Sequence, residues 1–170
     1  LCEDTRTTAK LLERYGIRTR LMAYHEHNAA KVRPAILRSL GEGQVIALVS
    51  DAGMPLVSDP GYRLVRAARE AGILVTSLPG ASAAITALTL SGLPSDRFLF
   101  AGFLPAKAKA RSEALAELAT ARATLVFYET AQRLAAMLAA LGETLPGREL
   151  AVARYVIVPD AGHSAWEPGI

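Results

Sequence analysis

The chain has 170 residues, of which 51% are hydrophobic, and carries a formal net charge of +3. This length accommodates one domain or two small ones with a real core, and the modest positive charge is compatible with an RNA partner without establishing one. No apolar run approaches the ~20 residues that a membrane span needs, and no signal peptide is visible, so we expect no membrane partner. A single cysteine, Cys2, cannot form an internal disulfide, which favours the cytoplasm.

The first forty residues predict strand, helix, strand and helix. Residues 1–3 are typical of a strand end, and a helix follows that Asp4 or Thr5 can cap and that Gly16 ends. Arg20–Tyr24 is a short strand candidate, and the polar loop 25–28 follows it. Ala29–Leu40 then predicts a helix that is interrupted near Pro34, with the proline in its first turn.

The next fifty residues repeat this alternation. Val45–Ser50 is a short apolar run, typical of a strand buried on both faces, and Gly61–Ala71 and Ala83–Leu90 have helical spacing. Ile73–Leu78 is a second apolar, β-branched strand. Strands that alternate with helices in this way indicate an α/β fold with a mostly parallel sheet.

The polar segment 91–96 is the best candidate for a domain boundary. After it we expect strands at 97–103, 123–128 and 149–153, with helices at 107–121 and 130–141. The chain is therefore predicted to consist of an α/β domain at 1–95, a partial second α/β domain at 96–154 and a separate tail at 155–170.

The loop between residues 51 and 61 is the strongest candidate for a ligand site. It contains two Asp, two Pro and two Gly within eleven residues, directly after a buried strand. Ligands bind at the carboxyl ends of strands in open α/β sheets, and a loop with little side-chain bulk lets them approach the backbone. From the residues alone, a plain strand-to-helix connection remains equally open.

Two polar clusters have competing interpretations. Residues 3–6 place two carboxylates and a guanidinium at a strand end, where a helix cap with a local ion pair is the simplest interpretation. His25 and His27 lie two residues apart, which places them on one face of an extended segment. No third or fourth ligand accompanies them, so we predict no metal site and expect a polar loop on the substrate side.

Several ordered motifs resemble one protein family. The stretch SDAGMPLVSDPGYRLVRAA resembles the S-adenosylmethionine-binding loop of the small-subunit (16S) ribosomal RNA 2′-O-methyltransferase I family, within the tetrapyrrole methylase superfamily. CEDTRTTAKLLERYGI, YHEHN, SLPGASAAITALTLSGLP, DRFLFAGFLP and TLVFYE match it in the same order, from Leu1 to about Arg154. The resemblance implies a two-domain fold, S-adenosyl-L-methionine in the cleft between the domains, and methylation of a cytidine 2′-hydroxyl in the 16S RNA of the 30S subunit. Members of the superfamily commonly form dimers, so a homodimer is one expected assembly.

The resemblance also implies roles for individual residues. Candidates for the base that assists loss of the hydroxyl proton are Glu3, Asp4 and Glu129, and candidates for substrate binding are Arg6, His25, Glu26, His27 and Asn28. The residues expected at the cofactor are Asp51, Ala52, Gly53, Met54, Pro55, Asp59, Gly80, Ala81, Ser82, Ala83 and Tyr128. Met54 replaces a threonine that is usual in the family, and Thr130–Arg133 replaces its Ser-Pro-His-Arg segment.

Two alternatives remain open. One is methylation of a small tetrapyrrole with the same fold and cofactor, and the other is an inactive fragment. A first strand with a Thr-Pro-Ile-Gly-Asn loop precedes the position of Leu1 in the family, so we expect the chain to be truncated at both ends and its missing strand to lie inside the sheet. The tail from Tyr155 to Ile170 resembles the end of proline iminopeptidases, with His163 at the place of a triad histidine. Because the chain has no G-x-S-x-G nucleophile elbow, hydrolase activity is not expected.

Overall fold

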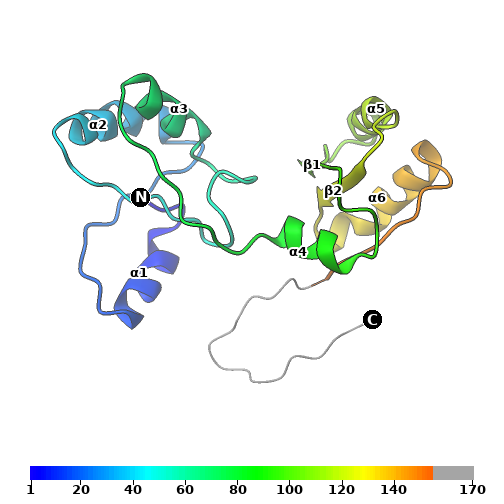
Figure 1. The fold of residues 1–170 in the computed structure, drawn as a ribbon, viewed down its shortest axis with the longest axis horizontal. Helices are drawn as coiled ribbons and strands as arrows, with labels where there is room; N and C mark the ends of the chain where they lie inside the picture. The colour runs from blue at the N-terminus through cyan, green and yellow to red at the C-terminus, as the bar shows by residue number, and fades with distance from the viewer. Residues whose placement is uncertain (155–170) are drawn as a thin grey trace. The chain divides into compact units, whose positions relative to one another are not determined.

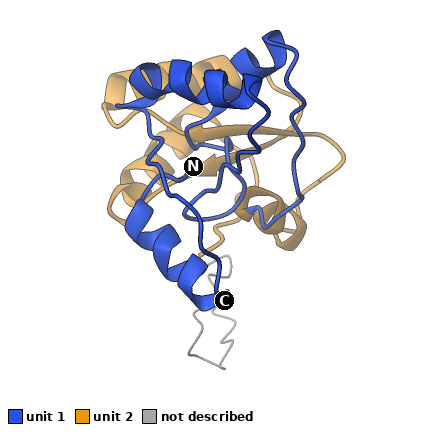
Figure 2. Cartoon of the chain, turned by 90° about the vertical axis from the view of Figure 1, so that its left-hand side faces the viewer, with its two compact units in different colours: residues 1–82 blue, residues 83–170 orange. Residues whose placement is uncertain are grey.

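The computed structural model describes residues 1–154, and they belong to two compact units (Figure 1, Figure 2). Unit 1 comprises residues 1–82 and unit 2 begins at Ala83. The helices of unit 1 are α1 (Thr5–Arg14), α2 (Ala29–Gly41) and α3 (Tyr62–Glu70). Unit 2 contains α4 (Ala83–Leu90), β1 (Phe98–Phe103), α5 (Ala108–Leu118), β2 (Thr124–Tyr128) and α6 (Ala131–Thr144). The domain boundary expected at residues 95 and 96 stays a prediction.

The helices of unit 1 begin and end near the residues that the sequence indicates. Asp4 caps α1, because its side chain accepts a hydrogen bond from the Arg6 backbone N–H at 2.8 Å. Pro34 lies inside α2 and not in its first turn, because the helix already begins at Ala29. A proline there costs one backbone hydrogen bond to the preceding turn but leaves α2 continuous.

The predicted strands of unit 1 are extended segments without a ladder. Arg20–Tyr24, Val45–Ser50 and Ile73–Leu78 are not strands in the described structure, and in unit 2 neither is the segment 149–153. What joins the first two segments is Cys2, which bridges Ala23 on one side and Val49 on the other, both in parallel. A strand forms when a neighbouring backbone is hydrogen-bonded to it along its length. Only residues 1 and 2 lie between these two segments, so they make single bridges and no ladder.

Unit 2 has a regular parallel pair of strands. β1 and β2 pair from Phe98 with Thr124 to Phe103 with Tyr128, with an irregularity between Phe100 and Gly102. Alternate residues of β2 face a core formed with α5 and α6; it contains Leu104, Leu115, Leu125, Phe127, Met137, Ala140 and Leu145. The α/β class is therefore confirmed, and no helix among the described residues is long and apolar enough to span a membrane.

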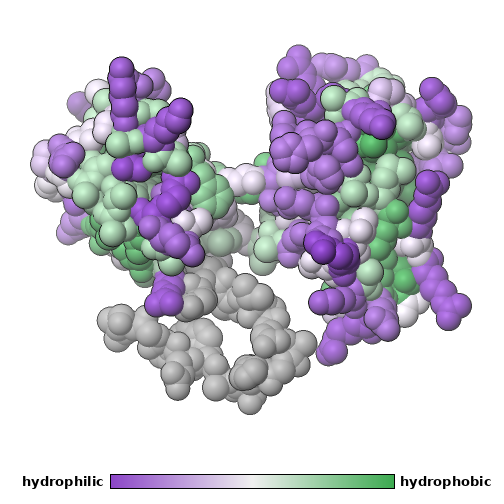
Figure 3. All heavy atoms as spheres, turned by 180° about the vertical axis from the view of Figure 1, so that it is seen from behind, coloured by the Kyte–Doolittle hydropathy of each residue, from purple (hydrophilic) through white to green (hydrophobic). Residues whose placement is uncertain are grey.

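A second core lies in unit 1 between α2, α3 and the extended segments. Tyr24, Ala29, Ile36 and Leu64 are buried in it, and Ile46 and Leu48 pack against it. Hydrophobic residues also reach the surface among hydrophilic ones on the face of the molecule in Figure 3. The core of unit 1 therefore fixes where the 24–28 loop and the start of α3 lie.

Candidate functional site

The loop after residue 50 and the turn at residues 79–82 meet in unit 1. Gly53 has φ +74°, and a Cβ atom there would lie 3.3 Å from the Ala81 carbonyl oxygen. A Cβ atom on Gly80 would lie 3.2 Å from the Met54 sulfur. The two turns expected at the cofactor are thus side by side, and the positive φ and the near backbone oxygen favour glycine at position 53.

The loop itself is held in an uncommon backbone conformation. Leu56 has φ 71° and Ser58 has φ 60°. Both values lie in the left-handed region, which residues other than glycine rarely adopt. The Ser50 hydroxyl donates to the Asp59 carboxylate, which ties the two ends of the loop together. Strained residues of this kind persist where the surrounding structure fixes them, often at binding sites. Asp59 therefore shapes the loop through Ser50.

An open pocket of about 510 Å³ adjoins the first residue of this loop. We call it the carboxylate pocket; it is lined by Glu3, Asp4, Thr5, Arg6, Ala23, His25, His27 and Asp51. The Asp4 backbone N–H donates to the Asp51 carboxylate at 3.4 Å, which joins the strand end to the loop. Five of the residues expected to act on the substrate thus lie beside Asp51.

Arg6 dominates the electrostatics of Asp4. Its guanidinium lies 2.6 Å from one carboxylate oxygen of Asp4 and 3.1 Å from the other. This hydrogen bonding, with the bond from the Arg6 backbone N–H, lowers the pKa of Asp4 to about 2. A carboxylate with so low a pKa is a weak base. Of the candidate bases in this pocket, Glu3 is therefore better suited than Asp4.

Residues of the 25–28 loop line two different pockets. Asn28 accepts a hydrogen bond from the His25 backbone N–H at 3.0 Å and donates to the Ala23 carbonyl oxygen at 2.9 Å, so it holds the loop in shape. The rings of His25 and His27 meet edge to face with centroids 6.0 Å apart. Glu26 lines a different pocket. Within residues 1–154 no three potential metal ligands gather at one place.

Two further candidates lie in unit 2. Tyr128 ends β2 and contacts the rings of Phe100 and Phe103, with centroids 4.8 and 5.5 Å away. One Glu129 oxygen accepts from the Thr130 backbone N–H at 2.8 Å and lies 3.2 Å from the Arg133 guanidinium. Its other oxygen is buried and has no hydrogen-bond partner among the described residues. The roles of Tyr128 and Glu129 at a cofactor or substrate stay predictions.

A comparison with protein families identifies the family of this chain. The family model for tetrapyrrole (corrin/porphyrin) methylases matches residues 1–160. The chain belongs to the tetrapyrrole methylase family. The predicted fold family is thereby confirmed, whereas the tail resemblance and His163 lie outside the described residues.

Curated relatives of this chain make the family assignment more specific. It is 56% identical to the "Ribosomal RNA small subunit methyltransferase I" of Mesorhizobium japonicum, over 90% of the chain and 52% of the relative. Proteins of the same name from Escherichia coli O157:H7 and Pasteurella multocida are 51% and 49% identical, over 97% of the chain and 56% and 57% of the relatives. The chain thus spans about half the length of the curated relatives it matches.

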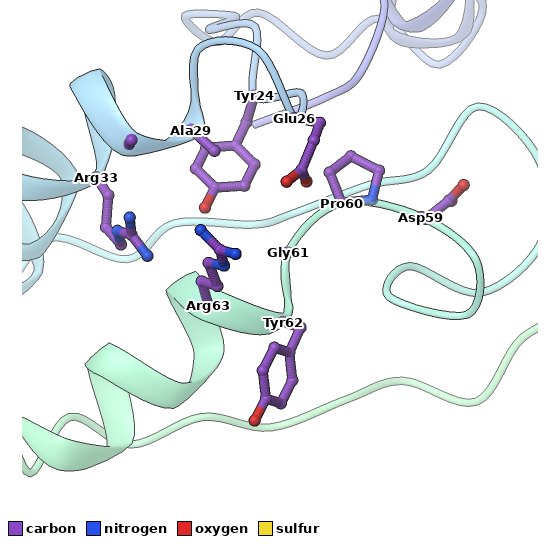
Figure 4. Close-up of a pocket in the computed structure, with 10 residues that line it drawn as sticks. Tyr24, Glu26, Ala29, Arg33, Asp59, Pro60, Gly61, Tyr62 and Arg63 are labelled. Atoms are coloured by element: carbon purple, nitrogen blue, oxygen red, sulfur yellow. The ribbon is translucent and has the colours of Figure 1, made fainter.

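The sequence did not predict a second pocket in this chain. We call it the arginine pocket; it has a volume of about 130 Å³, and its polar lining is Tyr24, Glu26, Arg33, Asp59, Tyr62 and Arg63 (Figure 4). One signal was present in the sequence. Arg63 stands in the first turn of a predicted helix, where the helix dipole disfavours a cation.

Proposed function

We propose that this protein transfers a methyl group from S-adenosyl-L-methionine to the ribose 2′-hydroxyl of a cytidine in small-subunit ribosomal RNA. The observation that carries the proposal is the carboxylate pocket, whose Asp51 opens the loop that meets the second glycine turn. The names of the curated relatives support the RNA substrate. A substrate of this kind implies action on the 30S subunit in the cytoplasm, and a homodimer remains a prediction.

The two turns fit the cofactor. Ala52, Gly53, Gly80 and Ala81 are exposed, and a Cβ atom on Gly53 would crowd the Ala81 carbonyl oxygen. Backbone N–H and C=O groups there can meet the amino acid and adenine parts of S-adenosylmethionine. When bound, this cofactor supplies an electrophilic methyl group on a sulfonium.

Within the carboxylate pocket, the protein must orient the hydroxyl and help its proton leave. Holding the reacting groups in line can supply much of the acceleration, and a positioned base contributes typically about 10²–10⁴-fold. Glu3 is exposed in the pocket, whereas Arg6 occupies both oxygens of Asp4. We therefore assign the base to Glu3 and a positioning role to Asp4, with Glu129 as the alternative base.

Methylation of a small tetrapyrrole is the competing function, since the family model carries that description. The test supplies labelled S-adenosylmethionine to the full-length protein with 30S subunits that lack the modification, or with a tetrapyrrole acceptor. We expect label on a ribose of the RNA. We expect Glu3→Gln to lower kcat by about 10²-fold or more and Glu13→Gln, outside the pocket, to leave it unchanged. Label on the tetrapyrrole alone would refute the RNA assignment.

A further inference from the structure

The arginine pocket is lined by a buried tyrosine, Tyr24. Tyr24 is 1% exposed, and its hydroxyl points into the pocket toward the guanidinium groups of Arg33 and Arg63 (Figure 4). It makes no side-chain hydrogen bond to any residue that the structure describes. Burial raises the pKa of Tyr24, so the hydroxyl keeps its proton and is available as a donor. A phenol hydroxyl in the lining of a pocket can donate to an acceptor that enters the pocket.

Two arginine side chains line the same pocket. Arg33 comes from α2 and Arg63 from α3, and neither forms an ion pair within residues 1–154. Two carboxylates also lie in the lining. Asp59 accepts a hydrogen bond from the Ser50 hydroxyl and points away from the arginines, whereas Glu26 is exposed, as is Arg63. The pocket thus presents two guanidinium groups and one phenol hydroxyl as donors against the single nearby carboxylate of Glu26.

Two helices begin at this pocket. Ala29 opens α2 and Tyr62 opens α3, and neither helix has a side-chain hydrogen bond at its N-cap. At Gly61, which has φ +138°, a Cβ atom would lie 2.8 Å from Leu48 Cδ2 and 2.9 Å from Leu56 Cδ1, so these two side chains crowd the N-cap of α3. In α2 the Ala29 and Lys31 N–H groups already donate to the His25 and Asn28 carbonyl oxygens, so the first turn of α3 is the end that can offer backbone N–H groups to an anion. An anion in the pocket would also offset the unfavourable placement of Arg63 in the first turn of α3.

We propose that the arginine pocket binds one phosphate group of an RNA strand whose ribose lies in the carboxylate pocket. The proposal rests on the proposed function and adds a second contact to it. The segment 24–27 indicates a polymer as the ligand. Tyr24 and Glu26 line the arginine pocket, and His25 and His27 line the carboxylate pocket. The two pockets are therefore separated by a single stretch of backbone, and a ligand that fills both must be larger than a free anion.

The test measures binding of a fluorescein-labelled single-stranded RNA oligonucleotide of about ten nucleotides to the full-length protein. We expect Arg33→Gln and Arg63→Gln each to weaken binding by about ten- to a hundredfold, as for loss of hydrogen bonds to a charged group. The controls are Arg38→Gln on α2 and Arg69→Gln on α3, which remove the same charge outside both pockets. Tyr24→Phe removes the hydroxyl alone and should weaken binding by several-fold, in line with a single hydrogen bond.

A second measurement varies the ligand. Replacing single phosphates of the oligonucleotide by neutral methylphosphonates should weaken binding strongly at one position, and Arg33→Gln should abolish this difference. The double variant Arg33→Gln with Arg63→Gln should also reduce the slope of log Kd against log salt by about 0.7, the value for one phosphate of a single strand.

The outcomes separate this inference from the proposed function. If the unmodified protein binds and methylates RNA but the pocket variants behave like Arg38→Gln and Arg69→Gln, the pocket assignment is wrong and the proposed function stands. If inorganic phosphate binds through Arg33 and Arg63 while no methylphosphonate position matters, the ligand is a free anion and the RNA assignment of this pocket is overturned. Absence of both RNA binding and methylation would contradict both proposals.

Discussion

The two units of the molecule contain the same kind of apolar segment with different results. In unit 2, Thr124–Tyr128 pairs with β1 and covers a core in which Leu115 is fully buried. In unit 1, Val45 and Leu74 belong to equally apolar segments but are 99% and 93% exposed. An apolar run therefore becomes a strand only where a neighbouring backbone pairs with it along its length.

The ion pairs of the two candidate catalytic carboxylates differ in the same direction. In unit 1 the side chains of Arg6 and Asp4 are 88% and 31% accessible, whereas those of Arg133 and Glu129 in unit 2 are 31% and 6% accessible. The pair of Asp4 therefore lies at the surface, and the pair of Glu129 is largely buried. This comparison predicts where substitutions affect stability and where they affect only local charge.

The largest expected effect is on the core of unit 2. Leu115→Ala should lower the free energy of unfolding by about 2–5 kcal/mol, because it leaves a cavity at a fully buried site. The matched substitution Leu74→Ala in unit 1 should change it by at most about 0.5 kcal/mol, as is usual for surface positions. That side chain is almost fully exposed. Urea unfolding followed by amide NMR signals of each unit measures both. Equal losses of unfolding free energy in Leu115→Ala and Leu74→Ala would contradict the difference between the two units.

A smaller effect concerns charge in unit 1. Arg6→Ala should raise the pKa of Asp4 from about 2 toward its ordinary value of 3.8, because the guanidinium hydrogen bonds are lost. Because the pKa of Asp4 is lowered in the folded protein, its ionised carboxylate stabilises the fold above pH 3.8, and this stabilisation is lost as the pH falls toward 2. The variant should lack this pH dependence. Carbon NMR titration of the Asp4 carboxyl measures the shift. The control Arg66→Ala removes an exposed pair with Glu70 and should leave Asp4 unchanged; a similar shift in this control would contradict the assignment.

The sequence predicts more of the site than of the sheet. Residues that follow successive parallel strands gather at one edge, and the loop at 51–55 does meet the turn at 79–82. The grouping of Glu3, Arg6 and His25 in one pocket was implied only by the family resemblance. Spacing could not show that Arg6 would bind Asp4 and lower its pKa, since this depends on a side-chain conformation.

The arginine pocket and the absence of strands from residues 1–82 could not be predicted from the sequence, for physical reasons. Tyr24, Arg33 and Arg63 come from three separate segments, and only the packing of α2 against α3 brings them together. The apolar patterns at 45–50 and 73–78 report the propensity of a segment to be buried. They do not report whether a partner strand is present to pair with it.

The central claim is that the two glycine turns of unit 1 hold S-adenosylmethionine. Calorimetric titration of the full-length Gly53→Val variant with this cofactor tests it most directly, because the new side chain would meet the Ala81 carbonyl oxygen between the turns. Gly16→Val is the matched control, with a similar φ of +62° and open space around it. We expect Gly53→Val to weaken binding by at least about tenfold, or ~1.4 kcal/mol, while Gly16→Val binds like the unmodified protein. Unchanged affinity in a folded Gly53→Val variant would contradict the account.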